Sequence, residues 1–272
     1  MNDKLLPKSL FYLLVILITI PFVLVLLSSF VNWTSFKELQ FHFEGYSKLL
    51  VDYRLEEIAR VILRSVLVAS VATLISFVVA YLLIFTQGKS FRNVFLFLIT
   101  LPFLINESMR AFSWYPLLAT NGFLNAGLSK VFGNEVDFFS FSNNANVTPI
   151  TVLGILSVGV FINTLVIDSI DKSIWKAAKD TGASAWTIFS SIGIPMGSAG
   201  IIFSFVTITL LSLSMSAEVA LLGGDTKLSL RILISSLLSA GEVSAVFALG
   251  SLLLVTSLVS IVGVLRIFKK SL

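Results

Sequence analysis

Residues 172–195 read K-S-I-W-K-A-A-K-D-T-G-A-S-A-W-T-I-F-S-S-I-G-I-P, and they lie between two long apolar runs. The first half predicts a short helix over residues 173–181, in which Ile174, Trp175 and Ala178 form an apolar stripe. Gly182 is expected to end this helix, since glycine takes the left-handed conformation beyond a helix end most easily.

The second half of this stretch, residues 185–192, predicts another short helix that ends at Pro195. A new helix can begin there, because the first turn of a helix does not need the N–H that proline lacks. We therefore expect a helix–glycine–helix segment over residues 172–195, at the surface of a membrane.

The composition indicates an integral membrane protein. Hydrophobic residues make up 56% of the chain and charged residues 12%, with a mean hydropathy of +0.97. Soluble domains carry about 25% charged residues. The absence of cysteine excludes thiolate metal sites. We find no basic face suited to nucleic acid, and the single histidine, His42, cannot build a metal site or a histidine-based catalytic site.

Six apolar runs are long enough to cross a hydrocarbon core of about 30 Å. They cover residues 10–30, 58–85, 91–111, 149–167, 196–222 and 243–267. We interpret the first run as an uncleaved anchor, because it is too long for a signal peptide and no small-residue cleavage site follows it. The expected fold is an all-α integral membrane protein with six transmembrane helices.

The distribution of positive charge predicts the orientation. The pieces expected inside the cell, residues 1–9, 87–92, 168–195 and 266–272, hold 10 of the 19 Lys and Arg residues in half the length of the external pieces. Positive charge concentrates in cytoplasmic loops. Both termini and the loop between helices 4 and 5 are therefore expected in the cytoplasm.

We divide the chain into three parts on this basis. Residues 1–57 form an N-terminal anchor helix and an external segment. Residues 58–267 form a five-helix core that contains the cytoplasmic loop 168–195, and residues 268–272 form a cytoplasmic tail.

Two sets of polar residues within the apolar runs are candidates for a solute pathway, because ionisable groups are costly in a membrane unless they are paired or hydrated. One set shares a helix face near the outer end of the third run, and a structural pair between Glu107 and Arg110 is the alternative explanation for it. The other is a row on the fifth run, where small hydroxyl residues also serve helix packing. The candidates are Asn106, Glu107, Arg110 and Trp114 in the first set, and Ser204, Thr207, Ser214 and Glu218 in the second.

The helix–glycine–helix segment resembles a signature of the permease subunits of binding-protein-dependent ABC importers, in which E-A-A is followed at fixed spacing by G and by I-x-L-P. The matching residues are Lys176-Ala177-Ala178, Gly182, Ile192 and Ile194-Pro195, with Asp180, Ala183 and Ser184 as in the common form of the signature. Two positions depart from it. Lys176 replaces the leading Glu, and Ile194 replaces Leu.

Further stretches resemble the spermidine/putrescine branch of these permeases. They are Leu101-Pro102-Phe103 with Asn106 and Arg110, then Asn121-Gly122-Phe123-Leu124-Asn125, and Leu221-Leu222-Gly223-Gly224. Permeases for ferric iron, sulfate and phosphorylated sugars share much of this pattern. A polyamine is our first expectation for the substrate, and those solutes are the alternatives.

The resemblance implies a non-enzymatic subunit of the bacterial inner membrane, in which two permease subunits form an alternating-access pore above two ATPase subunits. An external binding protein delivers the solute. Lys176 suggests to us that the second permease is a different chain. The residues implied to couple the pore to the ATPase are Ile174, Trp175, Lys176, Ala177, Ala178, Lys179, Asp180, Gly182, Ala183 and Ser184.

The chain is not expected to bind a cofactor of its own. Gly88-Lys89-Ser90 resembles the end of a nucleotide-binding loop, but the first glycine of that motif would fall at Leu83, and no strand precedes it. ATP and Mg²⁺ are therefore expected on the partner ATPases. An ion-coupled carrier or channel without an ATPase is the alternative function, although the halves show no clear internal repeat.

Overall fold

The computed structural model describes residues 5–31, 41–86, 88–119, 122–133, 144–222 and 229–271. Within these ranges every regular element is a helix, and one isolated β-bridge joins Val31 to Phe41. The predicted all-α class is confirmed. Several sequence interpretations lie outside the described residues. They concern residues 32–40 of the external segment, residues 134–143 of the following external loop, Asn121, and the turn at Gly223-Gly224-Asp225-Thr226.

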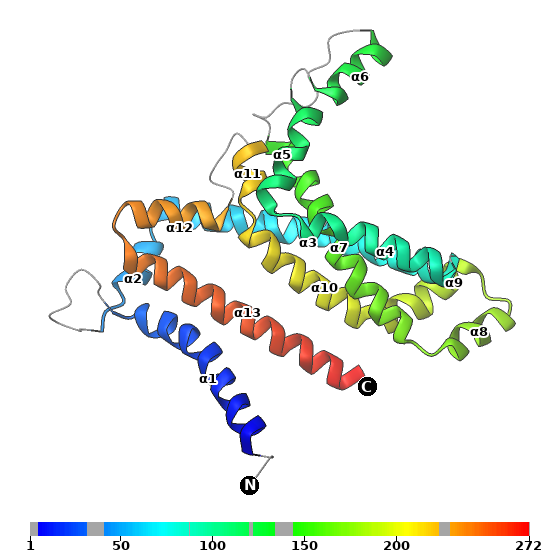
Figure 1. Ribbon diagram of the computed structural model, residues 1–272, viewed down its shortest axis with the longest axis horizontal. Coiled ribbons are helices and arrows are strands. Elements are labelled where there is room, and N and C mark those ends of the chain that lie inside the picture. Colours follow the sequence, from blue (N-terminus) through cyan, green and yellow to red (C-terminus); the bar gives the residue numbers. More distant parts are fainter. Residues whose placement is uncertain are drawn as a thin grey trace. The chain divides into compact units, whose positions relative to one another are not determined.

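The chain divides into two compact units, of which the first combines Met1–Ile58 with Leu233–Ser260. It contains α1 (Leu5–Ser28), α2 (Glu44–Leu49) and most of α13 (Val243–Ser271), which are labelled in Figure 1. The Tyr46 hydroxyl of α2 forms hydrogen bonds with Ser29 Oγ at 2.9 Å and with Ser251 Oγ at 2.8 Å. A single side chain thus joins α2 to the chain after α1 and to α13.

A close backbone approach fixes α2 against the start of α13. A Cβ atom added to Gly45 would lie 2.3 Å from the Ser244 carbonyl oxygen, so only glycine fits at this contact. Beside it, Arg54 and Glu242 form an ion pair at 2.6 Å. The Arg54 guanidinium donates a hydrogen bond to this carboxylate and holds the pKa of Glu242 below its usual range.

The second unit combines Ala59–Ile232 with Ile261–Leu272. Its long helices are α3 (Asp52–Thr86), α4 (Lys89–Leu104), α7 (Asn144–Ser169) and α10 (Ile194–Ser214). Its shorter elements are α5 (Glu107–Leu118), α6 (Phe123–Phe132), α8 (Lys172–Asp180), α9 (Ala185–Ile188) and α11 (Ala217–Leu222). The helix α12 (Leu230–Ser239) begins in this unit and belongs from Leu233 onward to the first unit.

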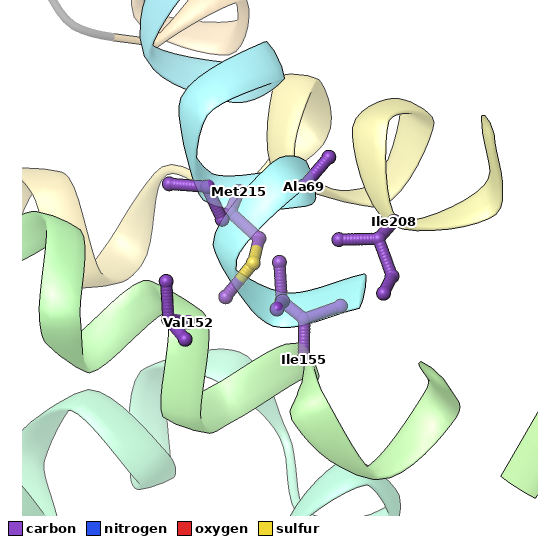
Figure 2. Packing of buried hydrophobic residues seen from close by; sticks show 7 residues of the cluster. Ala69, Val152, Ile155, Ile208 and Met215 are labelled. Carbon is purple, nitrogen blue, oxygen red and sulfur yellow. The ribbon is translucent and has the colours of Figure 1, made fainter. Parts of the chain in front are cut away.

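The core of this unit lies where α3, α7 and α10 pack together. Ala69 of α3, Val152 and Ile155 of α7, and Ile208 of α10 point toward one another, and Met215 closes the cluster beyond the end of α10 (Figure 2). Small residues let the helices approach closely, as is usual in membrane bundles.

A buried amide links the same three helices. Asn163 Nδ2 donates to Ser76 Oγ of α3 at 3.0 Å and to Ser204 Oγ of α10 at 3.1 Å. It also donates to the Gly159 carbonyl within α7. An added Cβ on Gly159 or Gly200 would lie within 3 Å of side chains of this contact, so both glycines make room for it.

Four helices of the described residues are long and apolar enough to cross a membrane. They cover Tyr53–Phe85, Thr148–Ser169, Ala185–Ser214 and Val243–Gly263. Lys89–Leu104 with Glu107–Phe132 would make a fifth span if this bent pair of helices counts as one. The apolar helix Tyr12–Ser28 is shorter.

The predicted third span is not one continuous helix. The chain breaks after α4 at Ile105 and bends by 99° before it continues in α5. Pro102 removes a backbone hydrogen bond from the last turn of α4, and the Asn106 side chain caps α5 by accepting a hydrogen bond from Ser108 N. The span expected over residues 91–111 therefore consists of two helices, α4 and the start of α5, with a bend between them.

Candidate functional site

The first half of the helix–glycine–helix segment is α8, within one residue of its predicted bounds. Its N-terminus is capped by Asp171, whose carboxylate accepts a hydrogen bond from Ser173 N at 2.9 Å. This backbone hydrogen bond lowers the pKa of Asp171 below its ordinary value, because it favours the charged carboxylate.

Gly182 ends α8 as predicted, with φ +75°. Its N–H donates to the Lys179 carbonyl, and the next N–H, of Ala183, donates to the Ala178 carbonyl. This pair of hydrogen bonds is the Schellman arrangement, which requires a left-handed residue. No atom lies within 4 Å of an added Cβ at Gly182, so the backbone conformation alone demands glycine here.

Trp175 fixes α8 to the rest of the second unit. Its ring is buried, and its ring centroid lies 4.5 Å from that of Phe85 and 6.1 Å from that of Tyr81, both on α3. Ile167 and Ile188 are buried in the same cluster. The ring therefore contacts α3 of its own chain rather than facing outward.

The other candidate residues of this segment divide between two faces. Ala178 and Ala183 pack partly buried against the Trp175 cluster, and Ile174 is half-buried. Ser184 caps α9 by accepting a hydrogen bond from Thr187 N at 3.1 Å. The exposed candidates are Lys176, Ala177, Lys179, Asp180, Gly182 and Ser184. Figure 1 shows α8 after the end of α7, where the chain turns back into α9.

The second half of the segment differs from the prediction at Pro195. The helix does not end there, because α9 continues through one π-helical turn, Phe189–Gly193, into α10. In a regular helix the proline ring would crowd the carbonyl four residues earlier. The wider π-helical turn before Pro195 accommodates the ring and keeps the helix continuous.

The polar candidates beside the breaks that follow α4 and α10 form an ionic cluster of Glu107, Arg110 and Glu218. Arg110 Nε and Nη2 both donate to Glu218 Oε1, at 2.9 and 2.7 Å. Arg110 Nη1 also donates to the Pro102 carbonyl at 3.2 Å. Glu218 is fully buried. Arg110 thus pairs over a long range with Glu218, and not with Glu107 as in the alternative explanation.

Glu107 contacts backbone N–H groups in this cluster, and not the guanidinium of Arg110. Its carboxylate accepts hydrogen bonds from the backbone N–H groups of Ser216 and Ala217. These groups begin α11, after the chain breaks at the end of α10, and a negative charge is favourable at a helix N-terminus. Glu107 therefore fastens the start of α5 to the start of α11.

Two arginines that the sequence interpretation did not select also lie at this site. Arg64 of α3 is buried, and its Nη2 donates to Thr151 Oγ1 of α7 at 2.6 Å. Arg231 Nη1 lies 3.4 Å from Ser216 Oγ. An arginine within the apolar sequence of residues 61–75 was a usable signal for Arg64, whereas nothing local indicated Arg231.

The remaining pathway candidates are not brought to the cluster. Ser204 is buried in the Asn163 contact, Thr207 is half-buried, and Ser214 is exposed. The break after Ser214 takes Glu218 out of the helical row that the sequence predicted. Trp114 packs partly buried against Leu118 and its apolar neighbours. Among the described residues, no group of three His, Cys, Asp or Glu side chains could hold a metal ion.

Comparison with known proteins identifies related permeases. The chain is 27% identical over 234 residues to the spermidine/putrescine transport system permease protein PotB of Haemophilus influenzae, covering 82% of this chain and 78% of the relative. It is 28% identical over 221 residues to PotB of Escherichia coli, covering 79% and 78%. The resemblance to ABC importer permeases is confirmed. No protein-family model matches the chain.

Solved structures show the same fold. A bacterial ABC transporter involved in the import of the acidic polysaccharide alginate contains a chain that matches with a TM-score of 0.68, at 20% identity, over 99% of this chain and 95% of its own length. The alginate transporter in complex with a pentasaccharide-bound periplasmic protein matches with a TM-score of 0.69, at 19% identity, over 96% and 90%.

Proposed function

We propose that this chain is the permease subunit of an ATP-driven importer of polyamines, in which it forms half of the solute pathway. The observation that carries this function is the similarity to spermidine/putrescine permeases over about four fifths of the chain. The capped, anchored geometry of α8 supports it, because a short rigid helix can transmit force without any chemistry in this chain.

The contacts of α8 suggest how motion reaches the transmembrane helices. Hydrogen-bonded caps at both ends keep α8 rigid, and Trp175 couples it to α3. Next to it, Arg92 at the start of α4 makes two hydrogen bonds to Asp168 at the end of α7, at 3.0 and 3.4 Å. A displacement of α8 would therefore pass to α3, α4 and α7 together.

The ionic cluster is our candidate for the solute-facing end of the pathway. It joins two interrupted helices, and interrupted helices at membrane depth mark transport sites in other carriers. Glu218 Oε2 is buried and accepts no hydrogen bond within the described part of the chain. A buried carboxylate oxygen of this kind suits an amine cation such as a polyamine.

The proposed topology has six spans, both termini in the cytoplasm, and residence in the bacterial inner membrane. The four long apolar helices and the bent pair support five of these spans, and the shorter apolar helix in α1 supplies the sixth. The excess of lysine and arginine in the proposed cytoplasmic pieces supports the orientation.

In this proposal two ATPase subunits bind and hydrolyse ATP with Mg²⁺ at the cytoplasmic face, while this chain holds no cofactor. A second, different permease chain completes the pore, and an external binding protein delivers the solute. The similarity to spermidine/putrescine permeases supports the polyamine. The structural neighbour in complex with a periplasmic protein supports the binding protein.

The test is to tag this chain, purify it gently from its native membranes, and identify the bound subunits by mass spectrometry. The purified assembly is then placed in liposomes that contain ATP, and uptake of labelled spermidine and putrescine is measured, with ADP as the control. Labelled sulfate, ferric iron and a phosphorylated sugar serve as competing substrates.

Copurification of an ATPase, a second permease and a binding protein, with spermidine uptake only in the presence of ATP, is the expected result. Purification of this chain alone, with uptake that needs no ATP, would instead support an ion-coupled carrier or a channel. ATP-driven uptake of one of the competing solutes would retain the importer and replace its substrate.

A further inference from the structure

The exposed face of α8 carries a stripe of three lysines. Lys172, Lys176 and Lys179 are all exposed. At 100° per residue they fall within about 60° of one another around the helix. Within the part of the chain that the structure describes, none of the three forms an ion pair. We call this set the lysine stripe.

The apolar face of α8 is already covered by its own chain. Trp175 is buried against α3, and Ala178 packs partly buried in the same cluster. A helix that docks into a partner's groove ordinarily does so through apolar anchors spaced three or four residues apart. The lysine stripe and the small Ala177 side chain are what α8 presents to a partner instead.

The acidic residues of this region do not cancel the stripe. Asp171 is occupied as the cap of α8, where it accepts the Ser173 N–H. Asp180 lies at the edge of the stripe, about 40° from Lys176. The centre of the exposed face is therefore positive.

We propose that α8 docks by charge, and that the ATPase surface it enters is an acidic groove whose carboxylates pair with Lys172, Lys176 and Lys179. This inference rests on the proposed function, which supplies an ATPase beneath the segment. An excess of lysine is enough to keep a loop in the cytoplasm, and the lysines need not lie on one face of a helix for this. Because the three lysines of α8 do share one face, we infer that they contact a protein partner. Contacts of this kind give specificity and are weakened by salt.

The first experiment is zero-length cross-linking of the intact purified assembly with a carbodiimide, followed by mass spectrometry. The expected result is amide bonds from the amines of the lysine stripe to Asp or Glu side chains of the ATPase. If the three amines form no such bond, and acetylate as fast in the assembly as in the isolated chain, the proposal is overturned.

The second experiment compares variants by the salt concentration that releases the ATPase from the immobilised assembly. K172E/K176E/K179E should weaken retention on the order of tenfold or more, and K172Q/K176Q/K179Q by less. Lys89→Glu is the matched control for the single variant Lys176→Glu. Lys89 is exposed at the start of α4 and outside the stripe, so its reversal should leave retention unchanged.

The outcomes separate this proposal from its alternatives. Equal retention in all variants, with wild-type transport, overturns the lysine stripe and leaves the importer intact. Unchanged retention with transport lost only in liposomes containing anionic phosphatidylglycerol assigns the stripe to lipid headgroups and overturns the proposal. An assembly without any ATPase overturns the proposed function and this inference together.

Discussion

In α8 an aromatic ring is buried and the charges are exposed, whereas in the ionic cluster the charges themselves are buried. Trp175 holds α8 by packing on α3, and the lysine stripe remains outside. Arg110 and Glu218 hold α5 to α11 by a buried ion pair. Packing tolerates small changes, but a buried charge left without its partner does not. The two regions should therefore differ sharply in their response to mutation.

Arg110→Ala is expected to have the largest effect. It would leave the fully buried carboxylate of Glu218 without the guanidinium with which it pairs. Breaking a buried pair on one side costs about 3–5 kcal/mol. The yield of folded protein and its unfolding midpoint in mild detergent should both fall.

The double variant R110L/E218L is the control for this effect. Since it removes both charges and restores apolar volume, it should recover most of the stability that Arg110→Ala loses. It should not recover transport if the cluster lies on the pathway. If Arg110→Ala were as stable as the wild type, the pair of Arg110 with Glu218 would not contribute to stability.

Trp175→Ala should have the next largest effect and act locally. Truncating a buried tryptophan costs about 3 kcal/mol at the lower end of the usual range, which suits a surface helix that can partly collapse. ATP hydrolysis should continue while solute uptake falls, because α8 is no longer held to α3. The ratio of uptake to hydrolysis in liposomes measures this uncoupling.

Trp186→Ala is the matched control, since Trp186 lies on α9 and is 72% exposed. It should change the free energy of unfolding by less than about 0.5 kcal/mol. Equal losses of coupling in both variants would contradict the anchoring role of Trp175.

The same contrast explains what the sequence could predict. The bounds of α8 and the role of Gly182 follow from propensity and capping within a few residues, and both are as predicted. The backbone partners of Glu107 and the carboxylate partner of Arg110 lie more than 100 positions away along the chain. Periodicity on one helix cannot reveal them, so it suggested a pair between the two residues themselves.

The helix breaks were missed for a related reason. Hydropathy measures apolar length and does not register a change of direction, so residues 91–111 and 196–222 were each interpreted as one span. The local signals for the first break were present in the sequence. Pro102 lies in the last turn of α4, and Asn106 caps the start of α5. The similarity to known permeases was predicted from motifs, whereas the roles assigned to individual residues stay predictions.

Gly182→Ala should have a moderate effect. Its cost is conformational only, because Gly182 has φ +75° and open space around it. A left-handed non-glycine residue costs about 1–2 kcal/mol. Gly88→Ala is matched to it, since Gly88 also has open space but takes an extended conformation with φ −66°. Thermal unfolding should distinguish the two, and similar losses would rule out the conformational explanation.

The smallest expected effect concerns the cap of α8 and its dependence on pH. The hydrogen bond from Ser173 N lowers the pKa of Asp171, so the folded state favours the charged carboxylate. The stabilisation is thus present above the ordinary pKa of aspartate. It is lost as the pH falls through the lower value of the folded state. In Asp171→Asn the amide oxygen still accepts the hydrogen bond without titrating, so this variant should respond less to acid.

Single cysteines can measure this effect, because the chain has none of its own. Ala178→Cys reports the half-buried face of α8 and Ala177→Cys its exposed face. The ratio of their labelling rates cancels the titration of the thiol itself. The ratio should rise in acid for the wild-type cap and stay flatter with Asp171→Asn. An identical rise of this ratio with the wild-type cap and with Asp171→Asn would mean that α8 loosens by losing the contact of Trp175 with α3. The cap would then contribute little to the rigidity of α8.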